Sequence, residues 1–194
     1  MPNEINNTIH SSFWANLFKR NLHRSDLIDI LTEIPPFADL RSQTAKELFA
    51  SMHQRQFISG EYIFLQDDPG IGLYIITDGE VQIEINDNNG EKLIIAEFGK
   101  GDFFGELALL DGEKRSASAK AKTDTKVSVL FKPDLDNIIK RYPKDGVNIL
   151  SRFTKIIITR LRNLNQEYFQ LYNENLKLKE AKNAKLDEQH SRPD

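Results

Sequence analysis

One stretch decides how this sequence is understood: FFGELALLDGEKRSASA, residues 103–119. A glycine precedes one short apolar helical turn, and a loop with a single arginine follows. Gly105 lets the backbone approach a ligand closely, and the amides of Leu107 and Ala108 at a helix start form a site for an anion. Arg115 can hold phosphate oxygens with its planar guanidinium. The stretch therefore predicts a phosphate-binding loop.

Glu106 needs a separate explanation beside such a loop. A carboxylate repels phosphate unless it accepts a hydrogen bond from a hydroxyl nearby, and a ribose 2′-hydroxyl supplies that donor. A phosphate and a free 2′-hydroxyl on one compact ligand are the chemistry of a 3′,5′-cyclic nucleotide. The base stays open, because Ser116 beside Arg115 can donate to the phosphate or reach the amine of a syn guanine. We favour cAMP over cGMP.

The segments 105–108 and 115–117 together resemble the phosphate-binding cassette of the cyclic nucleotide-binding domain family, which includes the catabolite activator and the regulatory subunits of protein kinase A. The step of nine positions from Glu106 to Arg115 is similar to that of the kinase subunits and one shorter than in the catabolite activator. The resemblance runs from about residue 34 to about residue 164. It is carried further by the segments Ser59–Phe64, Leu73–Ile76 and Gly79–Val81.

This resemblance implies a role for each cassette residue. Glu106 takes the ribose hydroxyl, while Arg115 and the amides at the helix start take the cyclic phosphate. Ile83 and Ile95 line the base. The implied ligand-binding residues are Gly105, Glu106, Leu107, Ala108, Arg115, Ser116 and Ala117. The ligand is the only small molecule expected, with no cofactor and no metal.

The surrounding pattern predicts an α+β chain built on an antiparallel β-sandwich or jelly-roll barrel, with no long crossover of the kind a parallel sheet needs. Between residues 53 and 132, short alternating runs are separated by turns rich in Gly, Asp and Asn. The expected strands are Tyr62–Leu65, Leu73–Ile76, Val81–Ile85, Leu93–Ala96 and Val127–Phe131. We expect this cyclic nucleotide-binding domain to span residues 34–143.

Helices are expected on both sides of the strands. Residues 1–33 form an amphipathic extension whose aromatic and basic segment either contacts a partner or membrane surface or, as we favour, packs on its own domain. Pro35 and Pro36 end it, and a further helix runs to about Met52. After the strands, the segment from Asp134 to Gly146 is the expected hinge, with Gly146 as its pivot.

A long helix over residues 144–182 carries a heptad pattern. With Val147 at position a, eight of the ten a and d positions are apolar, so the helix should form a homodimeric coiled coil, in which Asn175 fixes the register. Its upper part, with Ile149, Phe153 and Ile156 on a second apolar face, should pack on its own sheet. The polar residues 183–194 are expected to be disordered. The a and d positions are Val147, Leu150, Thr154, Ile157, Leu161, Leu164, Tyr168, Leu171, Asn175 and Leu178.

Composition limits the function classes. A net charge of −3 gives no overall attraction to nucleic acid, and only 16 residues follow Leu178, too few for a winged helix, so direct DNA binding is not expected. The absence of cysteine and of apolar runs long enough to cross a bilayer favours the cytoplasm. No kinase, channel or cyclase segment is recognisable. We therefore expect a non-catalytic regulator that signals to a separate effector protein.

Two alternatives remain. The first is a dimeric scaffold that keeps the fold but binds no nucleotide. The second is a cupin-like metalloenzyme, since cupins share the double-sheet shape. A cupin site needs clustered histidines and carboxylates on neighbouring strands, and the strand region offers only His53.

Overall fold

A computed structural model of the chain describes residues 33–87 and 90–190, with side chains described as far as residue 179. The chain divides into one unit that ends at Leu150 and a second that begins at Ser151. Apart from Glu33, the helical extension predicted for residues 1–33 lies outside the described residues. No helix in the described ranges is both long enough and apolar enough to cross a membrane.

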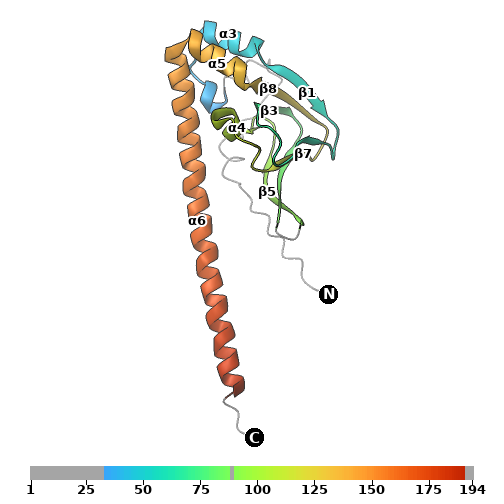
Figure 1. Cartoon of the computed structure of the whole chain (residues 1–194), viewed down its shortest axis with the longest axis vertical. Coiled ribbons are helices and arrows are strands. Elements are labelled where there is room, and N and C mark those ends of the chain that lie inside the picture. Colours follow the sequence, from blue (N-terminus) through green and yellow to red (C-terminus); the bar gives the residue numbers. More distant parts are fainter. Residues whose placement is uncertain (1–32, 88–89, 191–194) are drawn as a thin grey trace. The chain divides into compact units, whose positions relative to one another are not determined.

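Two four-stranded antiparallel sheets form the body of the first unit (Figure 1). The first sheet has the strand order β1-β8-β3-β6 and the second the order β2-β7-β4-β5. The predicted sandwich is therefore confirmed. The strands are β1 (His53–Phe57), β2 (Tyr62–Phe64), β3 (Gly72–Asp78), β4 (Val81–Asn86), β5 (Lys92–Phe98), β6 (Phe103–Phe104), β7 (Ser118–Ala121) and β8 (Thr125–Phe131).

The core of this unit is made by the inward-facing side chains of the strands. Along β4, Val81 and Ile83 are buried while Gln82 is half-exposed, the period of two that a sheet with one buried face requires. Burial of such side chains contributes about 1.5–3 kcal/mol each. The buried cluster nearest the predicted cassette consists of Ile76, Val81, Ile83, Phe104, Ala117, Ala119, Val127 and Val129.

The predicted turn at Asp78-Gly79 connects β3 to β4 and needs its glycine. Gly79 has a φ of +87°, and an added Cβ would lie 2.4 Å from the carbonyl oxygen of Asp124. A side chain at this position would strain the backbone and clash with the start of β8. The turn therefore connects β3 of the first sheet to β4 of the second sheet.

The outer face of the second sheet carries a buried carboxylate. Glu84 on β4 is 5% exposed, and the Tyr62 hydroxyl from β2 donates a hydrogen bond to its Oε2 at 2.8 Å. Gln82 donates to Oε1, and Lys92 from β5 donates to the Tyr62 hydroxyl. These bonds satisfy a group that would be costly to bury alone, and they connect three strands.

The helices of the first unit begin with the short 3-10 helix η1 (Pro35–Phe37), which is followed by α3 (Ser42–Ala50). The helix α4 (Glu106–Asp111) lies within the cassette, and α5 (Lys132–Arg141) follows β8 directly. The last helix, α6 (Pro143–His190), begins in this unit and continues into the second. The helices α3 and α5 lie side by side (Figure 1).

The break between α5 and α6 lies at Tyr142, whose φ and ψ are −127° and 67°. Gly146, the expected pivot, does not lie at this break. Gly146 lies inside α6, and a Cβ there would stand 3.0 Å from the Cα of Ile139, so this glycine permits close helix packing. Pro143 at the start of α6 enforces the break, because proline disfavours helix at the preceding residue.

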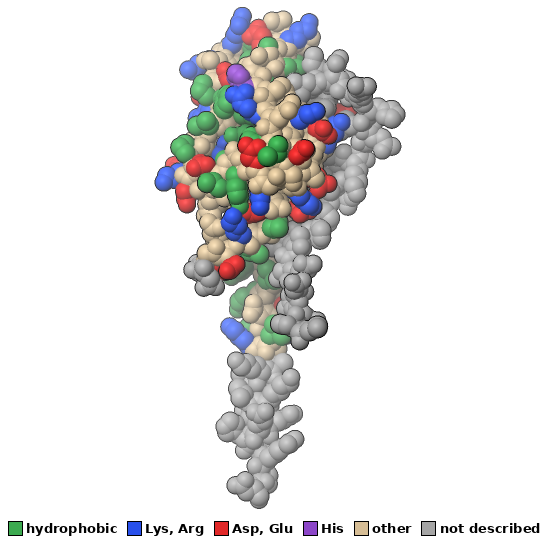
Figure 2. All heavy atoms as spheres, turned by 90° about the vertical axis from the view of Figure 1, so that its right-hand side faces the viewer, with side chains coloured by type: hydrophobic (Ala, Val, Ile, Leu, Met, Phe, Trp, Pro, Cys, Tyr) green, Lys and Arg blue, Asp and Glu red, His purple; other side chains and the backbone are tan. Residues whose placement is uncertain are grey.

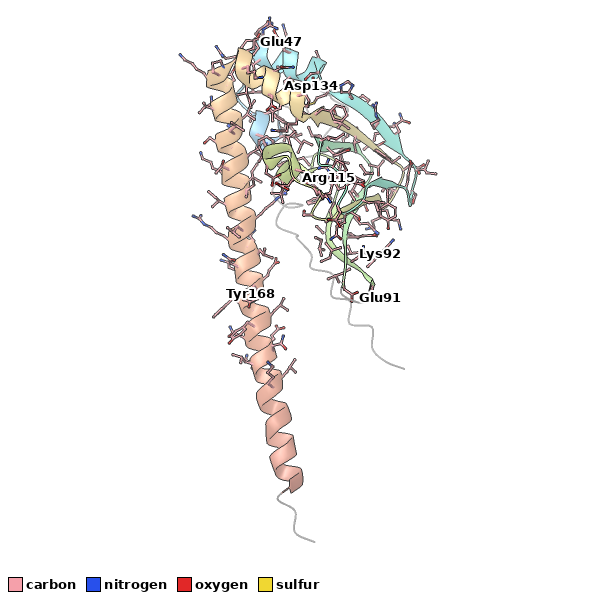
Figure 3. The ribbon with its side chains drawn as sticks, viewed as in Figure 1. Glu47, Glu91, Lys92, Arg115, Asp134 and Tyr168 are labelled. Atoms are coloured by element: carbon pink, nitrogen blue, oxygen red, sulfur yellow. The ribbon has the colours of Figure 1, made fainter. Side chains whose placement is uncertain are left out.

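A polar network joins α3 to this break. Asp145 is buried, and its carboxylate accepts hydrogen bonds from the Thr44 hydroxyl and from Nε of Arg41, the latter at 2.9 Å. Glu47 accepts a hydrogen bond from the Tyr142 hydroxyl at 2.5 Å, at the end of the unit where Figure 3 labels it. The network ties the α5–α6 junction to a helix about a hundred positions earlier in the sequence.

The second unit consists of the remainder of α6, which ends at His190 and is longer than the helix expected over residues 144–182. Phe153 and Ile156 are buried. From Leu161 onward the apolar side chains of the predicted seam are exposed, for example Leu164 at 61% and Tyr168 at 68%. An exposed apolar stripe of this kind is typical of a helix that pairs with another, and the coiled coil stays a prediction.

Candidate ligand-binding site

The cassette begins with two sharp backbone turns that flank α4. Gly105 is the N-cap of α4 and Gly112 its C-cap, with φ values of +79° and +77°, the left-handed region that glycine adopts most readily. The first amides of a helix have no partner within the helix and carry its positive dipole end. The turn at Gly105 therefore presents donors from α4 at the end of β6.

Arg115 follows α4 and points into the interior, where α4 meets the strands (Figure 3). Its side chain is buried, with the residue only 3% exposed. Nη1 donates to the carbonyl oxygen of Gly105 at 3.0 Å and Nη2 to that of Gly72 at 2.8 Å. Its Nε is buried and has no hydrogen-bond partner within the part of the chain that the structure describes. A buried donor without a partner is rare in folded proteins and points to a ligand.

Two aromatic rings pack against this guanidinium. The Cζ of Arg115 lies 4.1 Å from the ring centroid of Phe64 on β2 and 5.4 Å from that of Tyr74 on β3. Both distances are within the range of cation–π attraction. Phe104 stacks on Tyr74 at 5.3 Å and lies 5.8 Å from Phe64, so the rings form one cluster that bridges the two sheets.

The charge of Arg115 is kept in spite of this burial. Desolvation lowers the pKa of its guanidinium, whereas Tyr74 raises it through its electrostatic interaction and a side-chain hydrogen bond. Glu106 and Asp68 add smaller electrostatic contributions that also favour the charged form. Because arginine remains protonated in proteins, the site holds a permanent cation in a partly desolvated position.

The main chain of Arg115 is held by the loop between β2 and β3. Its amide donates to the carbonyl of Asp68, and its carbonyl accepts from the amide of Asp67, both at 2.9 Å. Gly70 of the same loop approaches α4 so closely that an added Cβ would stand 2.0 Å from the Cβ of Ala108. The loop and the cassette therefore form one packed structure.

The structure places the other predicted residues in two environments. Glu106 is buried at the start of α4, and Ala108 and Ala117 are also buried. Leu107 and Ser116 are exposed at the surface of the cassette. Of the two residues expected to line a base, Ile83 belongs to the buried cluster and Ile95 packs against it.

Three residues at the site were missed by the sequence reasoning: Gly72, Phe64 and Tyr74. Gly72 contributes only a carbonyl oxygen, which no sequence pattern can indicate. The two aromatic residues lie in runs that already read as strands, so nothing local separated them from ordinary core residues. The one signal present in the sequence was an aromatic residue in each of two successive predicted strands that precede Arg115.

Two observations bear on metal binding and on DNA binding. Within residues 33–87 and 90–190, no group of three or more His, Asp or Glu side chains lies close enough to hold a metal ion. Figure 2 shows Lys and Arg side chains interspersed with Asp and Glu on the face in view, with no region of one sign. A duplex-binding surface concentrates positive charge, and this face does not.

Comparisons with known proteins agree on one family. Its model, described as "Cyclic nucleotide-binding domain", matches residues 54–142. The chain is 33% identical over 158 residues to a protein of Rhodopseudomonas palustris whose name assigns it to the potassium channels, with 79% of this chain and 37% of that protein covered. It is 32% identical over 133 residues to the "Cyclic AMP receptor protein" of Thermus thermophilus, with 69% and 60% covered.

Solved structures give the same result. The crystal structure of the N-terminal domain of a transcriptional regulator from Streptomyces coelicolor A3(2) superposes with a TM-score of 0.61 at 31% identity, and 71% of this chain and 96% of that domain are covered. The chain spans well under two thirds of the potassium channel protein and 60% of the receptor protein. The likeness therefore concerns one domain of those longer relatives.

Proposed function

We propose, because this chain belongs to the cyclic nucleotide-binding domain family, that it binds a 3′,5′-cyclic nucleotide at residues 105–117 and acts as a non-catalytic regulator. One observation carries the proposal. The buried guanidinium of Arg115 keeps an Nε–H donor without a partner among the described residues, and the same side chain contacts Gly105, the N-cap of α4. A cyclic phosphate would supply the missing acceptor oxygens.

The chemistry of the site suits a phosphodiester. Arg115 and the amides of Leu107 and Ala108 would donate hydrogen bonds to the phosphate oxygens, and Glu106 would accept a hydrogen bond from the ribose 2′-hydroxyl. Glu106 favours the charged form of Arg115, so the site pairs one fixed cation with one carboxylate. A ligand with a single negative charge and a free hydroxyl fits both groups, whereas a dianionic monoester would be repelled by Glu106.

We propose cAMP as the ligand. The relative from Thermus thermophilus is named a cyclic AMP receptor protein. Ser116 stands exposed beside Arg115, so its hydroxyl can serve either purine, and the test must therefore compare both nucleotides. A regulator of this kind would act in the cytoplasm, which the absence of cysteine from the chain also favours.

The signal would leave the domain through the helices that follow β8. Ligand binding would bias the position of α5 and α6 at the break near Tyr142, and a separate effector protein would respond. We also propose a parallel homodimer through α6. In the heptad register that starts at Val147, Glu174 occupies a g position and Lys179 the e position that would face it on the second copy, an attractive pair between two exposed residues.

Isothermal titration calorimetry tests the ligand. The wild-type chain is titrated with cAMP, cGMP and 5′-AMP, and Arg115→Ala with cAMP. We expect a heat of binding when cAMP is added to the wild type, a smaller heat with cGMP and no heat with 5′-AMP. Addition of cAMP to Arg115→Ala should give no heat of binding. Equal heats in the wild type and the variant would refute the role of Arg115.

Thermal unfolding separates this function from a scaffold that binds nothing. A ligand specific to the folded state raises stability by about 2.7 kcal/mol at a hundred times its dissociation constant. A melting temperature unmoved by millimolar cAMP and cGMP would favour the ligand-free dimeric scaffold. Sedimentation at several protein concentrations measures the dimer independently of any ligand.

A further inference from the structure

We propose that Phe64 and Tyr74 are positioning residues that hold the Arg115 guanidinium ready for its ligand. The inference rests on the proposed function, because it assigns further residues to the same site. Phe64 comes from the second sheet and Tyr74 from the first, and the two rings are 5.3 Å apart at an angle of 50°. The guanidinium therefore packs where the two sheets meet.

Of the two rings, Phe64 lies closer to the guanidinium. Its ring centroid lies 4.1 Å from the Cζ of Arg115, close enough for the cation to be in contact with the ring face. Cation–π attraction grows when the partners are removed from water, and Arg115 is 3% exposed. Leucine at position 64 would fill most of the same space without offering a negative ring face.

Tyr74 supplies a second aromatic ring beside Arg115. Its centroid lies 5.4 Å from the Cζ of Arg115, and the ring stacks on Phe104 with an interplanar angle of 11°. This stacking fixes the ring in one orientation. The two carbonyls of Gly72 and Gly105 hold the Nη atoms, while the rings pack against the guanidinium.

Such an arrangement matters for affinity because arginine has a long side chain with several freely rotating bonds. A solvated arginine loses that freedom when it binds a phosphate, and the loss weakens binding. Here the freedom is lost on folding. The Nε–H is the donor that remains for the ligand.

The test compares Phe64→Leu with Phe98→Leu. Phe98 stacks on Phe104 in the same aromatic cluster, with centroids 6.3 Å apart, and is half-buried like Phe64. We expect Phe64→Leu to weaken cAMP binding by about tenfold to thirtyfold. The control Phe98→Leu should weaken it by less than about threefold at a similar loss of stability. Equal effects of the two variants on affinity would overturn the proposal.

A second measurement does not depend on any ligand. In the free protein, the Nε–H resonance of Arg115 should be shifted by the neighbouring rings and should exchange slowly with water. In Phe64→Leu the chemical shift of this resonance should move toward that of exposed arginines, while in Phe98→Leu the chemical shift should stay unchanged. An Arg115 signal that resembles exposed arginines in the wild type would refute the positioning role.

The two measurements distinguish the possible failures. If the wild-type chain binds no cyclic nucleotide but the Arg115 resonance is shifted and protected, the proposed function fails and the positioning of the guanidinium stands. If cAMP binds and Phe64→Leu changes neither affinity nor resonance, the proposed function stands and this inference fails. Tyr74→Phe, which keeps the ring, should lose less affinity than Phe64→Leu, and a larger loss would assign the positioning to the hydroxyl and overturn the role of the Phe64 ring.

Discussion

Replacement of Gly105 by alanine should damage both the stability of the domain and its ligand site. The new Cβ would stand 2.6 Å from Nη1 of Arg115 and 3.1 Å from the carbonyl oxygen of Gly72. A side chain at a left-handed φ costs about 1–2 kcal/mol. Because Nη1 ends a flexible side chain, it can move away, but it then gives up a charge-assisted hydrogen bond worth about 1.5–3 kcal/mol. The expected total is about 2.5–5 kcal/mol.

Gly112→Ala is the matched control for this change. Gly112 caps the other end of α4 with a φ of +77° against +79° for Gly105, and an added Cβ would meet no atom within 4 Å. It therefore carries the backbone strain alone, about 1–2 kcal/mol. The difference between the two variants isolates the cost of moving Arg115.

Urea unfolding followed by circular dichroism measures both free energies, and calorimetry with cAMP measures the affinities. We expect Gly105→Ala to bind at least about tenfold more weakly than the wild type, which corresponds to about 1.4 kcal/mol, and Gly112→Ala to bind nearly as well. Equal losses of stability and of affinity in the two variants would show that the guanidinium is not held where the structure places it.

Three further changes probe other parts of the chain. Desolvation raises the pKa of Asp145, but the hydrogen bonds from Thr44 and Arg41 lower it more, so the pKa lies below its ordinary value. Asp145→Asn should cost about 1–2 kcal/mol at pH 7, and the gap to wild type should narrow as the pH falls from about 4 toward the lowered pKa of Asp145; a gap as large at pH 3 as at pH 7 in urea unfolding would contradict this. Tyr62→Phe should cost about 1–3 kcal/mol, because it removes a donor from buried Glu84, and a neutral result in urea unfolding would argue against that bond. Asn175→Val should stabilise the helix pair while loosening its oligomeric state, and a strict dimer unchanged in sedimentation would count against the heptad register.

The sequence predicted the strands whose apolar residues form a clear run bounded by turns, whereas the buried strands β6 and β7 were not among the expected ones. At the start of β4, buried Val81 and Ile83 flank half-exposed Gln82, and a glycine turn precedes the strand, so both its type and its place were readable. By contrast, β1 has exposed or half-exposed side chains throughout. Its sequence HQRQF carries no alternation of apolar residues, and it becomes a strand because it pairs with β8. Pairing between distant segments leaves no local trace.

The candidate site was predictable in part for a similar reason. Gly105, Glu106 and Arg115 lie within one stretch, so their spacing could be interpreted as a phosphate site. The rings of Phe64 and Tyr74 reach Arg115 only through the assembled sheets. The bond from Thr44 to Asp145 joins positions 101 apart, and both residue types are ordinary surface residues in a sequence. Their burial depends on helix packing.

The hydrogen bond from Arg115 to Gly72 has a consequence for how the protein is made. It joins positions 43 apart, and Gly72 itself lies on a strand paired with β8, which ends at Phe131. Contacts between such distant positions form late and slow the folding of β-rich domains to milliseconds or longer. While the chain emerges from the ribosome, Arg115 must remain hydrated until the last strand has been synthesised. The nascent protein would therefore become responsive to its ligand in one step, when β8 closes the first sheet.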